Sequence, residues 1–457
     1  MHKLAIPLVI LLSVGATASA QGDARGLVLR SVSISTGYTA VQLPPVTLGG
    51  YLPNDVFGAD LITSTGIDLS WNQSTARTTF GANFAGSYTM RAKFPGMNSF
   101  GSNASLELTR RIGRFWRASA SAAEFITDSE QASSLPTSTE ALVTTPATTE
   151  ELAGTVALRR SLNPDLTQAS LFVPINQSFI NTQFYGNRIQ GTVAGGSLSY
   201  IPSSRFSTFV SLSYSRLARL ASSNEPGVAL SFPKTSVQNA GAGVTYSLTP
   251  RSQITGVVTL SRTAGIFAQD SINPTMTYGW SGRKWFMAAT MGFGVLKGRV
   301  DANVYGATDQ SSSAPSSTQA ASAKNFGGPG LVAHGVIGYK FGWQTFMADF
   351  SRGFHDEFGY GGFKGTVTSV VGSWFWAPPG RSWHIQANLT QFHAPGNFSF
   401  INSWLATASL GRVLGPHLLM KGEFTFDRHG SRGFEGFHMT KQGFHLSLIW
   451  SPVRRII

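Results

Sequence analysis

Two groups of polar residues in the last quarter of the chain carry side chains able to do acid–base or metal chemistry. The first is the run His355-Asp356-Glu357, and the second places His429 and His438 beside carboxylates. Imidazole and carboxylate groups transfer protons or activate a nucleophile. Neither spacing fixes a geometry, and no nucleophile motif accompanies either group. We therefore expect solvated loop residues here, with no catalytic residue, no metal site and no cofactor, and a hydrolase is the least favoured function.

A third group of charged residues follows the two-residue period of a β-strand. Lys421 and Glu423 alternate with Met420 and Phe424, so the charged and the apolar side chains fall on opposite faces. Charges on the inner face of a hollow sheet would tune ion selectivity; the alternative is a polar wall that selects no solute. The candidates for lining such a lumen are Glu107, Arg117, Asp349, His384, Lys421, Glu423 and Asp427.

The same alternation recurs along most of the chain. In 242–261, apolar residues at 244, 246 and 248 lead into Thr249-Pro250-Arg251, and the pattern resumes at Ile254, which predicts a β-hairpin. Further strands are predicted at 29–41, 60–71, 77–91, 102–110, 115–126, 188–201, 205–217, 271–280, 284–296, 331–340, 343–352, 365–376, 382–392, 401–414, 417–428 and 440–450.

The connections between these strands are of two kinds. Tight turns end at or just before a basic residue or histidine, whereas longer, Gly/Ser/Asn-rich connections occur at 218–234, 265–270, 306–329, 353–363, 393–400 and 428–438. Short turns alternating with long loops are typical of bacterial outer-membrane barrels. Residues 152–176 read as a hairpin or as part of a helix, which gives 18 to 20 strands.

The predicted fold class is all-β: a transmembrane antiparallel up-and-down β-barrel with an even strand number. A membrane leaves no water for unpaired backbone groups, so such a sheet has to close on itself. A secreted sandwich, propeller or solenoid is less favoured, because no blade-length or hexapeptide repeat is visible. Residues 127–187 form the third long connection, and its acidic residues include Glu130, Glu140, Glu150 and Glu151.

The first 20 residues have the features of a secretory signal peptide. His2 and Lys3 precede an apolar run over 4–14, and Ala18-Ser19-Ala20 matches a small-x-small cleavage site. The run is too short for a membrane-anchoring helix. We expect residues 1–20 to be removed and 21–457 to form one barrel domain in the outer membrane of a Gram-negative cell.

The composition suits a protein that faces both lipid and water. The chain has no cysteine, only 12% charged residues and a formal charge of +13, against about 25% charged residues in ordinary soluble domains. Nucleic-acid binding is disfavoured because the basic residues are scattered among turns and strand ends. Lipopolysaccharide phosphates or anions in a lumen are better partners for this charge. Residues expected in an interfacial aromatic girdle are Trp280, Trp285, Trp374, Trp376, Trp383 and Trp450.

Two stretches resemble known families. Residues 441–450, with Gly443, Leu446, Leu448 and Trp450, resemble the C-terminal signal read by the barrel-assembly machinery, although the chain continues to Ile457. Asn54-Asp55-Val56-Phe57 and the strand after it resemble the opening of outer-membrane β-barrel porins, some of them associated with exopolysaccharide export. The Asn and Asp are in reverse order here.

These resemblances imply an outer-membrane channel for passive or weakly selective diffusion of small hydrophilic solutes. The alternative is the outer-membrane component of an exopolysaccharide or surface-polymer export system. In porins the third loop commonly narrows the pore, which would make Glu130, Glu140, Glu150 and Glu151 constriction residues; a plain extracellular loop is the other reading. The implied partners are outer-membrane lipid, lipopolysaccharide, the barrel-assembly machinery and small solutes, with no nucleic acid.

Overall fold

The computed structural model describes residues 26–42, 59–93, 98–128, 188–220, 234–264, 267–300, 325–353, 367–378, 382–395, 400–432 and 438–452. These residues form eighteen strands: β1 Gly26–Gln42, β2 Ala59–Ser74, β3 Thr78–Arg91, β4 Ser99–Ile112, β5 Trp116–Asp128, β6 Arg188–Tyr200, β7 Phe206–Arg219, β8 Thr235–Thr249, β9 Ser252–Ala264, β10 Phe267–Ser281, β11 Trp285–Val300, β12 Asn325–Phe341, β13 Gln344–Gly353, β14 Val367–Trp376, β15 Trp383–Pro395, β16 Phe400–Gly415, β17 Leu418–Arg432 and β18 His438–Trp450.

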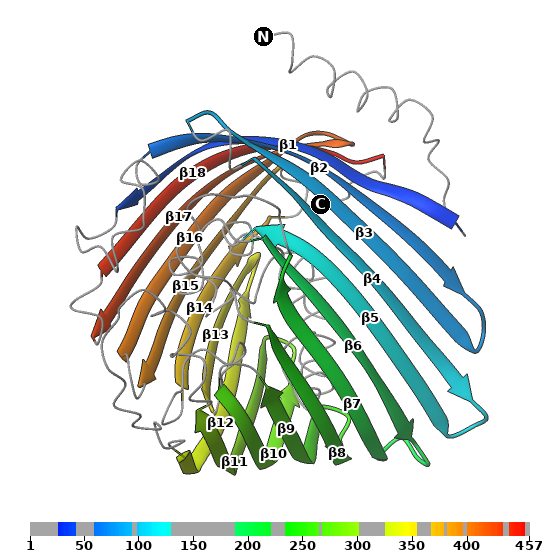
Figure 1. Ribbon diagram of the computed structural model, residues 1–457. Helices are drawn as coiled ribbons and strands as arrows, with labels where there is room; N and C mark the ends of the chain where they lie inside the picture. Colours follow the sequence, from blue (N-terminus) through cyan, green and yellow to red (C-terminus); the bar gives the residue numbers. More distant parts are fainter. Residues whose placement is uncertain are drawn as a thin grey trace, which may run out of the picture.

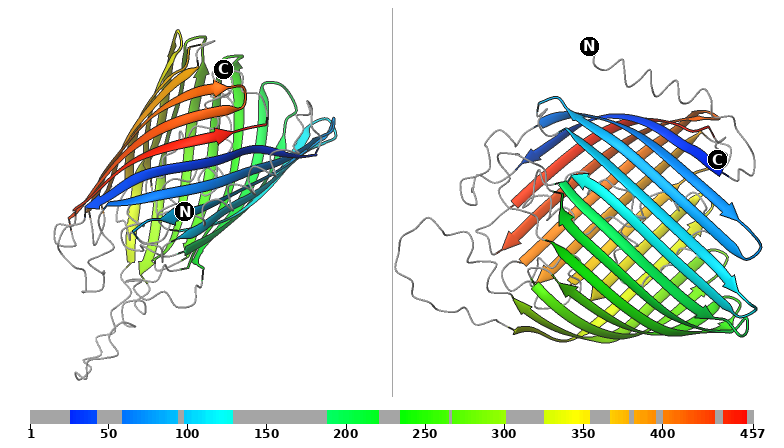
Figure 2. Two further views of the ribbon diagram at one scale, coloured as in Figure 1. Left: turned by 90° about the horizontal axis from the view of Figure 1, so that it is seen from above. Right: turned by 45° about the vertical axis from the view of Figure 1, so that its right-hand side comes forward.

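The strands close into one antiparallel up-and-down barrel. Each strand pairs with its neighbours in sequence, and β18 pairs with β1 from Val32↔Trp450 to Gln42↔Thr440. Figure 1 shows β1 and β18 side by side, and Figure 2 shows the strands inclined around the ring. The predicted fold class is confirmed. Because β5 pairs directly with β6 from Trp116↔Tyr200 to Asp128↔Arg188, the ring closes with eighteen strands. Residues 152–176 lie outside the described residues.

Burial alternates along the strands and distinguishes the two faces of the sheet. In β9, Val257 and Thr259 are 3% and 4% exposed, whereas Val258 and Leu260 are 45% and 51% exposed. Side chains converge on the concave face of a closed sheet and spread apart on the convex face. We therefore assign Val257 and Thr259 to the inner face, and strand pairing extends this assignment around the ring, because directly paired residues share a face.

The outer face carries a continuous apolar belt. On β17 it runs from Leu418 to Phe426, nine residues, and on β11 from Trp285 to Val295, eleven residues. The next outward-facing residue after each run is a cation, Arg428 on β17 and Lys297 on β11. A membrane-spanning β-strand needs about 9–11 residues when tilted by about 45°, so the belt has the height of a bilayer core.

Aromatic side chains border this belt at the end where the tight turns lie. Trp71 contacts Phe80 edge-on at 5.2 Å, and the rings of Trp285 and Tyr339 lie 4.2 Å apart. The six tryptophans expected in a girdle all fall on the outer face by register, and the Arg412 guanidinium lies over Trp383 at 4.8 Å. Amphipathic rings favour the level of lipid headgroups.

The tight turns depend on local chemistry. Gly113 between β4 and β5 and Gly342 between β12 and β13 have φ values of 65° and 55°, which side-chain-bearing residues adopt only with strain. In the β2–β3 turn, the Thr75 and Thr78 backbones pair through Thr75 N–H donating to Thr78 O at 2.7 Å. These turns and both ends of the described chain lie at the same end of the barrel.

One expected long connection is short. The segment 265–270 was predicted to be a loop, but β9 continues to Ala264 and β10 begins at Phe267, with Gln269 paired to Thr263. The polar residues Gln269 and Asp270 made this segment resemble a loop, yet they continue the alternation above the apolar belt. Strand pairing can extend into this polar zone because water satisfies the side chains there.

Candidate functional site

The inner wall combines hydroxyl and amide side chains that bond across strands with buried apolar side chains such as Val257 and Phe209. Thr277 and Thr290 lie 2.8 Å apart between β10 and β11, and Ser119 and Ser197 lie 2.7 Å apart between β5 and β6. On the other side of the ring, Asn388 donates to the Thr407 hydroxyl at 3.1 Å. These bonds pair polar groups that would otherwise lie unsatisfied among their neighbours, and they contribute uncharged, hydrophilic groups to the lining.

The densest group of charges on this wall lies on β17 and β18. Lys421 Nζ donates to Glu423 Oε2 at 2.5 Å, and His445 is directly paired with Glu423 across the strands. Two rungs further along, Asp427 is paired with Lys441 in the same way. Across these two strands, each of the two carboxylates is therefore directly paired with a basic side chain, Glu423 with His445 and Asp427 with Lys441.

A second pair joins β12 and β13. His334 Nε2 lies 3.3 Å from Asp349, and both side chains are largely shielded from solvent. On β15, His384 also faces inward, and its ring lies against Gly411 of β16, where an added Cβ would be 2.1 Å from the imidazole.

The remaining two candidates are on β4 and β5. By register, Glu107 shares the inner face with Gly81 and Ser121, and Arg117 shares it with Arg111. The structure thus places all seven lumen-lining candidates on the inner face but in separate groups around the ring. Sequence reasoning missed the inner-face residues His334, Lys340, Lys441 and His445, although the same alternation that identified Glu423 also applies to them.

The constriction candidates Glu130, Glu140, Glu150 and Glu151, like His355-Asp356-Glu357, lie outside the described residues. His429 and His438 belong to strand ends of β17 and β18 rather than to a loop, as β17 runs to Arg432. Within the described ranges, no three His, Asp or Glu side chains are grouped so that they could hold a metal ion. No helix in the described part of the chain is long and apolar enough to cross a membrane.

Some polar residues stand on the outer face, near the end opposite the tight turns. Arg262 and Asp270 form an exposed ion pair at 3.8 Å, and Glu124 accepts a hydrogen bond from Gln190. Lys297 is paired with Asp270, and Arg216 is on the same face of β7. These side chains begin where the apolar belt ends, so they indicate the boundary between hydrocarbon and headgroups.

No protein-family model and no curated protein matches this chain. The solved structures to which it is similar include those of three Pseudomonas aeruginosa proteins. OpdL is 11% identical, with 93% of this chain and 98% of that chain covered and a TM-score of 0.40. OccK2 (OpdF) is 11% identical, with 94% and 100% covered and a TM-score of 0.43. The outer membrane protein OpdK is 11% identical, with 92% and 99% covered and a TM-score of 0.38.

The strand pairing alone identifies the architectural class of this protein. The chain is a closed, antiparallel, eighteen-stranded barrel with an apolar outer belt and an inner wall that carries hydroxyl, amide and charged side chains. One group of these charges lies on β17 and β18.

Proposed function

We propose that this protein is an outer-membrane channel through which small hydrophilic solutes diffuse passively or with weak selectivity. The observation that supports this most strongly is the contrast between the two faces of a closed sheet: the exposed large apolar side chains of the strands lie on the outer face, whereas the inner face carries cross-strand hydroxyl and amide pairs. Val258 and Leu260 on the outer face of β9 suit lipid, while Thr255 and Thr259 on its inner face suit water. A barrel of 16–18 strands is wide enough for an aqueous channel, and diffusion requires no cofactor and no covalent step.

The inner charges would set the sign preference of the channel. Lys421, Glu423 and Asp427 lie together on β17, while Glu107 and Arg117 lie elsewhere on the ring, on β4 and β5. Because these charges are of both signs, we infer weak rather than strict ion selectivity. Asp349 and His384 would contribute to the same lining.

Planar-bilayer recording of the refolded protein tests the proposal. Stepwise current increases are expected as single barrels insert, and the folded state can be verified by the shift in gel mobility on heating. A folded, inserted protein that carries no current above background would overturn the channel. Current that appears only with a polymer-export partner would favour the alternative of a surface-polymer export component.

We also propose that the third long connection narrows this channel, with Glu130, Glu140, Glu150 and Glu151 contributing negative charge. Deleting residues 130–150 leaves β5, which ends at Asp128, and β6 intact. The deletion should raise single-channel conductance and reduce cation preference. Unchanged conductance would show that the segment does not constrict the pore.

We propose two further partners from where residues lie on the barrel. Lipopolysaccharide phosphates would contact Arg216, Arg262 and Lys297, which lie on the outer face beyond the apolar belt. The barrel-assembly machinery would read the last strand, where Leu446, Leu448 and Trp450 face outward and Gly443 faces inward. Residues 1–20 would serve as the export signal that precedes the barrel domain.

A further inference from the structure

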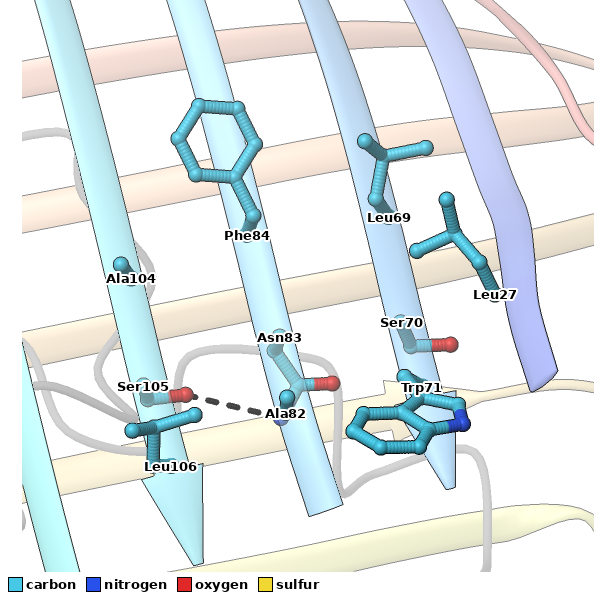
Figure 3. A pocket seen from close by; sticks show the side chains of 10 residues that line it. All are labelled: Leu27, Leu69, Ser70, Trp71, Ala82, Asn83, Phe84, Ala104, Ser105 and Leu106. Atoms are coloured by element: carbon cyan, nitrogen blue, oxygen red, sulfur yellow. Dashed lines mark hydrogen bonds between the residues drawn. The ribbon is translucent and has the colours of Figure 1, made fainter. Parts of the chain in front are cut away.

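The outer wall has a hollow of about 430 Å³ across β1 to β4, near the end with the tight turns. Figure 3 shows Ala82 between Trp71 and Leu106, and Phe84 beside Ala104. Strand pairing explains this shape. Trp71, Ala82 and Leu106 form one cross-strand row, and Phe84 and Ala104 belong to the next. Alanines next to large side chains leave a groove, since neighbouring strands are only about 4.8 Å apart.

The side chains that face the groove from the outer wall are hydrocarbon or aromatic. Ser70, Asn83 and Ser105 are on the same strands but on the inner face by register, where Asn83 donates to the Ser105 hydroxyl at 3.5 Å, drawn as the dashed line in Figure 3. A solute carried through the lumen therefore does not meet this groove. Its chemistry suits a hydrocarbon chain.

A group of arginines lies at the turn end of the groove. Arg110 is on the same face of β4 as Leu106, four positions closer to the turn, or about 13 Å at about 3.3 Å per residue. Arg77 lies in the β2–β3 turn, immediately before Thr78, the direct partner of Arg110, and its carbonyl accepts the Arg111 N–H at 2.7 Å. Arg114 lies over the Phe115 ring at 5.2 Å. Among the described residues, no carboxylate forms an ion pair with these arginines.

We propose that the groove and these arginines form a binding site for one anionic phospholipid. An acyl chain would occupy the groove over Ala82 and Ala104, and the phosphate would accept hydrogen bonds from Arg110 and Arg77. Guanidinium groups bind phosphate in a bidentate manner. The short turns of such barrels face the periplasm, where the membrane leaflet is made of phospholipid, which is why we choose a phospholipid over lipopolysaccharide. The inference rests on the membrane placement proposed above.

Native mass spectrometry of the detergent-purified, full-length protein tests the site with equal amounts of phosphatidylglycerol and phosphatidylethanolamine. The wild type should retain one phosphatidylglycerol. Loss of one charge-assisted hydrogen bond corresponds to about a tenfold change in affinity, so R110Q and R77Q should each weaken retention by about that factor. A82L combined with A104L should abolish retention by filling the groove.

Matched variants elsewhere on the barrel serve as controls. Ala242→Leu is on the outer face of β8, and Arg283→Gln is in the β10–β11 turn; neither should change lipid retention. Heat-shifted gel mobility verifies that each variant is folded. Conductance of the groove variants should equal that of the wild type, so a failure of the channel and a failure of the lipid site would be recognised separately.

Three results would overturn the proposal. Equal retention of the two lipids, unaffected by R110Q, would mean that no phosphate is recognised. Displacement of phosphatidylglycerol by an equimolar amount of lipopolysaccharide would assign the groove to the other leaflet. A dimer mass that disappears in the A82L/A104L variant would show that the groove receives a second copy of this chain.

Discussion

The imidazole of His445 on β18 lies against Gly37 on β1, so closely that a Cβ at position 37 would be 2.2 Å from its Nδ1 and 2.6 Å from the Phe444 carbonyl oxygen. The two residues are directly paired in the seam that closes the barrel. The absence of a side chain at Gly37 is therefore what allows the histidine ring to lie flat along the inner wall.

Among the described residues, this contact is one of five in which a ring covers a directly paired glycine. In each, an inward-facing ring lies against a directly paired glycine on the strand that follows around the ring. Covering a strand glycine with a ring shields its backbone and fills the space left by the missing side chain. The other four pairs are Phe125 with Gly191, Phe209 with Gly243, Phe286 with Gly338, and His384 with Gly411.

Replacing Gly37 by alanine should weaken the seam. The new methyl group would contact both a ring and a backbone carbonyl, and overpacking of this kind costs about 1–3 kcal/mol. Urea unfolding followed by tryptophan fluorescence would measure the loss. Gly256→Ala on β9 is the control, as nothing lies within 4 Å of the added atom. Equal unfolding midpoints for the two variants would contradict the packing argument.

The ion pair between Asp60 and Arg91 should be a strong local determinant of stability. Their side chains are 4% and 6% exposed and 3.5 Å apart, and Asp60 also accepts the Lys93 N–H at 2.9 Å. Removing one member of a buried pair costs about 3–5 kcal/mol, because the other charge loses its partner. Asp60→Asn should therefore lower the unfolding free energy by that amount. Adding Arg91→Met should restore most of it; no recovery in the double variant would argue against the pair.

Neutralising Glu423 should shift the channel toward anions. Glu423→Gln removes the carboxylate bonded to Lys421, so the positive charge of Lys421 is no longer balanced. The reversal potential in a salt gradient across a planar bilayer measures this preference. Glu124→Gln is a matched control, because Glu124 is on the outer face. A shift of similar size in both variants would rule out a local effect of the lumen charge.

A cation within the apolar belt should destabilise the barrel according to its depth. Arginine at the middle of the lipid-facing surface costs about 2–4 kcal/mol and about 0–1 kcal/mol near the interface. Val258→Arg should thus be much more damaging than Ala264→Arg, since both are on the outer face of β9 but Ala264 is beyond Arg262. Unfolding in phospholipid vesicles would compare them, and equal losses would mean that the belt is not embedded as proposed.

Most of the wall could be predicted from the sequence, because a two-residue period is a local property. The spacing of Val244, Tyr246 and Leu248 predicts that they share one face of a strand, without knowledge of any partner strand. Thr249-Pro250-Arg251 predicts the turn that follows. The pattern failed where polarity changes along a strand. Gln269 and Asp270 looked like loop residues because the polar end of a strand and a loop have the same local composition. They differ only in their position relative to the membrane, which the local sequence does not reveal.

The contacts between strands could not be predicted in the same way. His445 and Gly37 are far apart in sequence, and their contact depends on the register in which the last strand meets the first. The arginines near the groove were likewise visible only as scattered basic residues. Which of them gather at one point is decided by the pairing of β2 to β5, where Thr78 is paired with Arg110.

The seam also determines when assembly can finish. Ser451 donates its hydroxyl proton to the Arg30 carbonyl at 2.7 Å, a bond between residues 421 positions apart. A chain whose synthesis stopped before β18 would display two exposed strand edges and could not form this bond.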